Sequence, residues 1–168
     1  MKKKAGFTLL EILIAATIVG ALAVLATTSY RSTVAETHIQ AAKIRTEQLA
    51  NAVQRFQVDY GASKLAKGVE FSRLESVGAC NPTATETTAS KLIKCGYLQN
   101  DGGWNDIYVQ YYVCNNAKTA DTPCYNSGVS SPLACMRGRS ALNKLPEKYK
   151  KSDYSYCVSA DSRAETGS

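Results

Sequence analysis

Hydrophobic residues are distributed unevenly along the chain. The segment from Phe7 to Ala26 is apolar, and Glu11 carries its only ionisable side chain. About 20 consecutive apolar residues are enough for a helix to cross a bilayer. A carboxylate at bilayer depth costs roughly 2.5–3.5 kcal/mol or more and usually marks a function. The pattern therefore predicts a membrane-spanning helix in which Glu11 has a specific partner.

The same helix is predicted to continue well beyond the apolar segment. Residues 32–60 contain neither proline nor glycine. Apolar residues recur there at spacings of four, three and four, which describes one helical face: Leu49, Val53, Phe56 and Tyr60. Gly61 then supplies a C-terminal stop signal. We therefore expect one helix from Phe7 to Tyr60, about 80 Å long at 1.5 Å per residue.

After Gly61 the pattern changes to short elements. Residues 62–100 mix small apolar patches with polar residues and predict a loop, with a short helix around Ser90–Lys94. Residues 107–114 then alternate with period two and are rich in β-forming side chains. Leu133–Met136 and Tyr154–Val158 are two further strand candidates. These segments predict an α+β fold, in which a small antiparallel sheet packs on the second half of the long helix.

Composition is consistent with one modest domain beside this helix. The chain has 168 residues, of which 45% are hydrophobic and 20% charged, an ordinary globular balance. Its formal net charge is +6, but three of these charges belong to Lys2, Lys3 and Lys4. The remaining side chains sum to +3, which is too weak to indicate nucleic-acid binding by itself.

The six cysteines predict a disulfide framework. They are Cys80, Cys95, Cys114, Cys124, Cys135 and Cys157. They form no C-x-x-C pair, and the single histidine, His38, lies far away in sequence, so neither a metal site nor a cofactor is predicted. Six cysteines allow 15 connectivities, and sequence does not choose among them. The simplest arrangement pairs neighbours: Cys80 with Cys95, Cys114 with Cys124, and Cys135 with Cys157.

The N-terminal residues carry a family resemblance. A basic leader ends in Gly6, Phe7 follows, and Glu11 interrupts the apolar run. This arrangement resembles the prepilin signature of the type IV pilin superfamily. The resemblance implies cleavage between Gly6 and Phe7 by a prepilin peptidase, methylation of the new Phe7 amine, and assembly into a helical homo-oligomeric filament. It also implies that Glu11 of one subunit pairs with the Phe7 amine of a neighbour, which would neutralise both charges in a low-dielectric environment.

The resemblance sets the expected organisation and location of the chain. Residues 1–6 would be a cleaved leader, 7–30 the transmembrane and filament-core helix, 31–160 the globular head, and 161–168 a mobile tail. The precursor would reside in the inner membrane and would be handed to an inner-membrane assembly machinery. The mature subunit would end in an extracellular pilus that serves surface adhesion, motility or DNA uptake.

Alternative interpretations explain fewer residues. An ordinary signal peptide cut after Ala23 or Ala26, or a plain membrane anchor, leaves Glu11 without a role. A pseudopilin of a type II secretion system, in a periplasmic pseudopilus, is the nearest rival, because Gly103, Trp104 and Tyr108–Tyr112 faintly resemble the region before the last strands of those proteins. Three further residues could be imagined as calcium ligands, but their composition favours a turn: Asp101, Asn105 and Asp106.

A basic cluster near the C-terminus is a candidate binding surface. It consists of Arg137, Arg139, Lys144, Lys148, Lys150 and Lys151. Repeated along a filament, it could attract DNA or anionic surfaces with strong salt dependence, as in a minor pilin. A solvated face or inter-subunit pairing is the favoured interpretation of these charges. No arrangement of nucleophile, base or phosphate-binding loop is present in the sequence, which argues against an enzyme.

Overall fold

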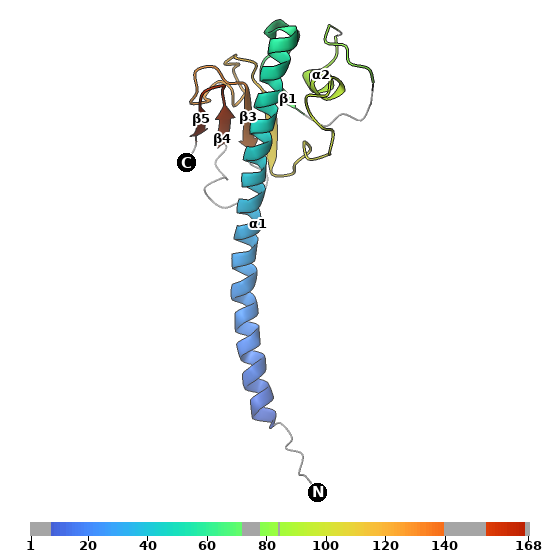
Figure 1. Cartoon of the computed structure of the whole chain (residues 1–168). Coiled ribbons are helices and arrows are strands. Elements are labelled where there is room, and N and C mark those ends of the chain that lie inside the picture. Colours follow the sequence, from blue (N-terminus) through green and yellow to red (C-terminus); the bar gives the residue numbers. More distant parts are fainter. Residues whose placement is uncertain (1–7, 72–77, 84, 140–153, 167–168) are drawn as a thin grey trace.

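A single long helix organises the molecule. The computed structural model describes residues 8–71, 78–83, 85–139 and 154–166. Helix α1 (Leu9–Tyr60) is a rod, and the other elements gather around the end of its second half (Figure 1). It ends at Gly61, whose φ of 88° suits glycine and whose N–H donates to the Gln57 carbonyl at 2.9 Å. The predicted long helix and its stop are therefore observed.

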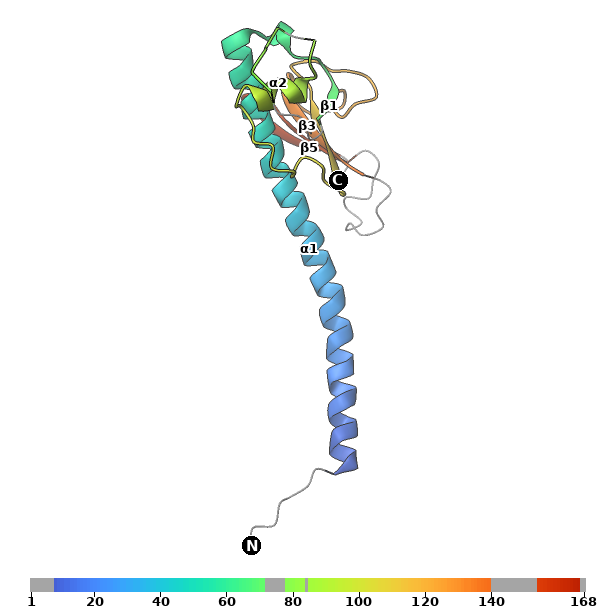
Figure 2. The same ribbon diagram turned by 90° about the vertical axis from the view of Figure 1, so that its right-hand side faces the viewer.

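Among the described residues, seven further elements form the head. They are the 3₁₀ turn η1 (Ala62–Lys64), β1 (Val69–Phe71), α2 (Thr88–Lys94), β2 (Val109–Val113), β3 (Ala134–Gly138), β4 (Ser155–Val158) and β5 (Arg163–Thr166). The strands form one antiparallel sheet in the order β1-β2-β3-β4-β5. This sheet lies along one side of the second half of α1 (Figure 2). The predicted α+β fold class is confirmed.

The predicted strands differ from the observed ones in three places. Strand β1 lies in the segment that was expected to be loop. Residues 163–166 form β5, so the prediction of a mobile tail is wrong for them. The strand predicted from Ile107 begins only at Val109, and Ile107 is 62% exposed. Within β2 itself, inward and outward residues alternate as expected.

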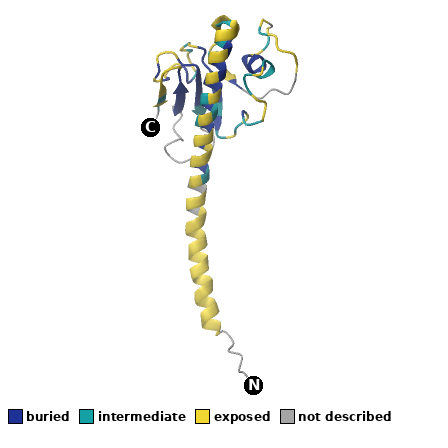
Figure 3. Ribbon diagram, viewed as in Figure 1, coloured by how far each residue is buried: buried dark blue, intermediate teal, exposed yellow. Residues whose placement is uncertain are grey.

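The face of α1 toward the sheet is a continuous buried stripe, longer than the sequence pattern indicated. Its members follow helical spacing: Ala35, Ile39, Ala42, Thr46, Leu49, Val53 and Phe56. Figure 3 shows the contrast between this part of α1 and its exposed first half. Thr46 is tolerated in the stripe because its hydroxyl donates to the Ala42 carbonyl at 2.8 Å. Tyr60, the last residue of the predicted stripe, is 40% exposed.

Both faces of the sheet are covered. Helix α1 contacts β2, β3 and β4 and shares the larger hydrophobic core with residues such as Tyr111 and Met136. On the opposite face, Cys135 of β3 and Cys157 of β4 belong to a second, smaller core together with Cys114, Cys124 and Val129. The loop between β2 and β3 supplies Cys124 and Val129 to it. A sheet covered on both faces needs buried residues at successive positions, as β4 shows.

Charged side chains attach the C-terminal strand to α1. The Glu47 carboxylate accepts hydrogen bonds from Tyr156 Oη at 2.7 Å and Arg163 Nε at 2.6 Å. One turn earlier on α1, Lys43 Nζ lies 2.8 Å from a carboxylate oxygen of Glu165. These contacts connect β4 and β5 to the helix through partly exposed groups.

Replacing Glu47 with glutamine is expected to lower the free energy of unfolding by about 1 kcal/mol or less at neutral pH, because solvent screens this partly exposed group. The Tyr156 hydrogen bond, and then Arg163, lower the pKa of Glu47 from its ordinary value of 4.5. Stabilisation by the charged form is therefore present above about pH 4.5 and is lost as the pH falls through the lowered pKa. The free energy of unfolding of the wild type and of the Glu47→Gln variant can be measured by denaturant titration from pH 7 to pH 3. The difference between the two proteins should shrink below about pH 4.5. A difference independent of pH would contradict this account.

Candidate functional site

The first turn of α1 contains the candidate residue Glu11. Thr8 Oγ1 accepts a hydrogen bond from the Glu11 N–H at 3.3 Å, and Glu11 Oε2 accepts one from the Thr8 N–H at 2.9 Å. The Thr8 hydroxyl also donates to Glu11 Oε2 at 3.0 Å. This reciprocal arrangement is a capping box, which satisfies N–H groups that have no partner within the helix. Thr8 was not among the residues predicted from sequence, although threonine followed three residues later by glutamate is a known capping signal.

The capping box defines what Glu11 does within one chain. Its carboxylate lies at the positive end of the helix dipole and is held there by Thr8. Gly6 and Phe7, the predicted cleavage junction, lie outside the described residues. The pairing of Glu11 with the Phe7 amine of a neighbouring subunit therefore stays a prediction.

The first half of α1 is an exposed apolar surface. In the described part of the chain, Leu9–Thr27 is the segment whose length and apolar composition would allow a helix to span a membrane. None of it is buried against the head, and Leu9 is 83% exposed. Continuous exposed apolar surface of this size marks a membrane or protein interaction site. Its hydroxyl groups are satisfied within the helix, since Thr17 donates to Ile14 and Thr27 to Ala23.

Gly20 lies in the middle of this apolar surface. A Cβ atom added there would have no atom within 4 Å in the single chain. No contact within the head therefore requires the glycine. The two interpretations from sequence, a soft point in the helix and close contact between helices, both place its role outside the isolated chain.

The head is held by three disulfides. The structure joins the six cysteines as neighbours: Cys80–Cys95, Cys114–Cys124 and Cys135–Cys157. Cys135 and Cys157 are opposite each other in the register of β3 and β4. The Cys114 and Cys135 sulfur atoms are 3.4 Å apart, so two disulfides lie in contact. These sulfur atoms are bonded to one another and offer no thiolate to a metal ion.

The acidic residues before β2 form turns. Asp101 Oδ1 accepts a hydrogen bond from the Gly103 N–H at 2.9 Å, and Asp106 Oδ1 accepts one from the Tyr108 N–H at 2.7 Å. Each carboxylate thus caps the backbone two residues further on, as in an Asx turn. These hydrogen bonds agree with the turn interpretation of Asp101 and Asp106. The single histidine, His38, lies on the exposed side of α1, with its ring centroid 4.9 Å from that of Tyr108.

The basic cluster is only partly described. Arg137 lies in β3 with its guanidinium 5.8 Å from the centroid of the Tyr112 ring, and Arg139 directly follows that strand. The other four members lie outside the described residues: Lys144, Lys148, Lys150 and Lys151. A DNA-binding or surface-binding role for the cluster stays a prediction.

The head also contains an open cleft of about 430 Å³ between α1 and the segment after α2. Its lining consists of Gln48, Asn51, Ala52, Arg55, Tyr97, Leu98, Gln99, Asp101 and Trp104. This set contains neither a histidine nor a serine or cysteine nucleophile. The cleft therefore does not assemble the groups of a nucleophilic active site.

Comparison with known proteins agrees with the N-terminal geometry. Residues 1–27 match the family model described as the prokaryotic N-terminal methylation motif. Searches of curated proteins and of solved structures gave no significant match. The matched region contains Gly6, Phe7, Glu11 and most of the exposed apolar half of α1. This prepilin-type motif indicates the superfamily of type IV pilins and pseudopilins, whose members are in general structural proteins rather than enzymes.

Proposed function

We propose that the chain is a structural subunit of a type IV pilus and polymerises through the first half of α1. The observation that carries the proposal is the exposed segment Leu9–Thr27, a long apolar surface of which none is buried against the described part of the head. Exposure of such a surface to water is energetically unfavourable. The membrane would cover it before assembly, and the helices of other subunits would cover it afterwards. The same surface can therefore anchor the precursor and hold the filament together.

Processing would prepare this surface for assembly. Cleavage after Gly6 would leave a new amine on Phe7, normally with a pKa of about 7.7–8.0 and therefore mostly cationic at neutral pH. N-methylation of an amine need not remove that charge. Glu11 lies in the first turn of α1, only a few residues along the chain from the new terminus. Pairing between subunits would neutralise both charges and fix the axial register of the filament.

Two features of the head favour a pilus over the pseudopilus of a secretion system. Three disulfides stabilise the head for exposure outside the cell. Asp101 and Asp106 direct carboxylate oxygens to backbone N–H groups of their own turns rather than to a common point. These two carboxylates therefore do not form a calcium loop. Such a loop would have favoured the pseudopilin interpretation.

Antibody labelling of intact cells, viewed by electron microscopy, tests the proposal. We expect labelled filaments on the cell surface, and unlabelled cells when the gene is deleted. Intact mass spectrometry of sheared filaments should give a chain that begins at Phe7, carries an N-terminal methyl group and gains six hydrogens on reduction. Labelling confined to the periplasm, together with a secretion defect in the deletion strain, would instead identify a pseudopilin.

A further inference from the structure

The three disulfides differ sharply in exposure. The four sulfur atoms of Cys114–Cys124 and Cys135–Cys157 belong to residues that are 0% exposed. By contrast, Cys80 is exposed and Cys95 is half-buried. Thiol–disulfide exchange requires an attacking thiolate to reach a sulfur atom. In the folded head, Cys80 is therefore the disulfide sulfur open to a thiolate from solvent.

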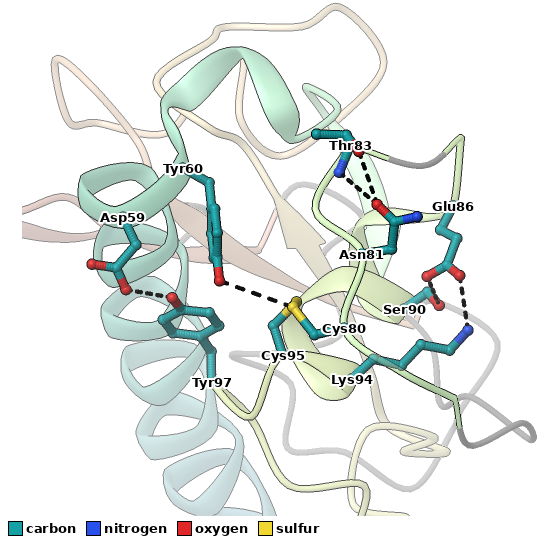
Figure 4. The surroundings of a disulfide bond; sticks show 10 residues. All are labelled: Asp59, Tyr60, Cys80, Asn81, Thr83, Glu86, Ser90, Lys94, Cys95 and Tyr97. Atoms are coloured by element: carbon teal, nitrogen blue, oxygen red, sulfur yellow. Dashed lines mark hydrogen bonds and ion pairs between the residues drawn. A yellow bond between two sulfur atoms is a disulfide. The ribbon is translucent and has the colours of Figure 1, made fainter.

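The surroundings of Cys80–Cys95 suit thiolate chemistry (Figure 4). The Tyr60 hydroxyl lies 4.0 Å from Cys80 Sγ, and it is the only possible donor of the two because a disulfide sulfur carries no hydrogen. The ammonium of Lys94, the residue before Cys95, is directed away from the sulfur atoms and is paired with Glu86 at 2.9 Å (Figure 4). The Tyr60 hydroxyl is therefore the group that can stabilise a thiolate at Cys80, because a hydrogen bond to the charged form favours that form.

We propose that Cys80–Cys95 is a thiol-exchange site of the head, which a dithiol reductant opens while the two buried disulfides stay intact. A thiolate of the reductant attacks the exposed Cys80 Sγ, which breaks the Cys80–Cys95 bond and expels the Cys95 thiolate. The second thiol of the reductant then attacks the mixed disulfide and releases Cys80. The head gains two electrons and two protons, and the reductant becomes a disulfide.

Other contacts keep the α2 side of the site in place after opening. Lys91 Nζ donates to the Lys64 carbonyl at 2.7 Å, and the Ala66 N–H donates to Thr88 Oγ1 at 3.1 Å. Leu92 is 0% exposed in the main core, and the Tyr97 hydroxyl donates to Asp59 of α1. Helix α2 therefore has its own attachments to α1 and η1. Opening should loosen the chain around Cys80 and leave α2 and the sheet folded, so that the disulfide can form again.

Limited reduction of the full chain in detergent micelles tests the proposal. The folded protein is treated with dithiothreitol for increasing times, quenched with acid, alkylated with iodoacetamide and analysed by peptide mass spectrometry. We expect Cys80 and Cys95 to be labelled at least about tenfold faster than the four buried cysteines. In denaturant the rates should converge, because burial is the cause of the difference. Equal rates in the folded protein, or slower labelling of Cys80 and Cys95, would overturn the proposal.

A variant with Cys80→Ser and Cys95→Ser provides the matched control. Under the brief treatment that labels the wild type, this variant should remain unlabelled. Hydrogen exchange on the selectively reduced wild type supplies a second measurement. Amides beside Cys80 should exchange faster after reduction, whereas those of β2, β3 and β4 should not change. Faster exchange throughout the sheet would show that this disulfide supports the whole head, contrary to the proposal.

Discussion

Replacing Glu11 with glutamine is expected to reduce filament yield on the order of 100-fold while α1 stays folded. Glutamine can retain the capping hydrogen bond from the Thr8 N–H, so the variant removes the charge and little else. In the proposed filament, the amine of a neighbouring Phe7 would then be buried without a partner, at a cost of about 3–5 kcal/mol. Filament yield is measured by shearing and immunoblotting, with the processed fraction followed in the same cells.

Thr8→Val is the control that separates capping from charge pairing. It removes the hydroxyl that accepts the Glu11 N–H, at a cost of about 1 kcal/mol of helix stability, and leaves the Glu11 carboxylate in place. Filament yield should therefore stay close to that of the wild type. If Glu11→Gln subunits are processed and assemble at normal yield, the charge-pairing mechanism is wrong. If Thr8→Val abolishes assembly equally, capping rather than charge pairing is the function of Glu11.

Removing the Cys135–Cys157 disulfide by a double alanine substitution is expected to destabilise the head by about 3–5 kcal/mol and to prevent its accumulation. The chain-entropy model gives about 3.4 kcal/mol for its sequence separation of 22 residues. Both cysteines also belong to the smaller core, and the Cys135 sulfur contacts that of Cys114, so the loss of both sulfur atoms leaves a cavity. Thermal unfolding followed by circular dichroism, together with protein levels in cells, measures the effect.

The equivalent variant of Cys80 and Cys95 is the comparison. Its sequence separation of 15 residues predicts about 3 kcal/mol by chain entropy, but Cys80 is exposed and Cys95 is only partly buried at the edge of the larger core. We therefore expect a smaller loss of stability and a head that still folds. If the two variants unfold at the same temperature, burial in the smaller core adds nothing to the stabilisation that the Cys135–Cys157 disulfide provides.

The elements with strong local signals could be predicted from sequence. The apolar run and the unbroken segment before Gly61 specify α1, and period-two alternation specifies β2. The buried stripe was predicted too short because its earlier part, apart from Ile39, consists of small or polar residues: Ala35, Ala42 and Thr46. Such residues carry little hydrophobic signal, and their burial becomes evident only when the sheet is placed against the helix.

The edge strands were missed for a different reason. Strand β1 has only three residues, and β5 reads Arg-Ala-Glu-Thr, a composition typical of a solvated tail. β5 is ordered by pairing with β4 and by contacts of Arg163 and Glu165 with α1. Contacts across more than a hundred residues leave no periodic pattern in the sequence. Thr8 differs, because its capping signal is local and could have been recognised.

The attachment of β5 to α1 also sets the order of events during biogenesis. Lys43 and Glu165 are 122 residues apart, and Glu47 and Arg163 are 116 residues apart. Strand β5 is therefore synthesised more than a hundred residues after the part of α1 that it contacts. In the proposed pilin, a nascent subunit anchored by its first helix would expose an unpaired β4 edge until β5 is translocated, and during this interval the edge would be open to aggregation.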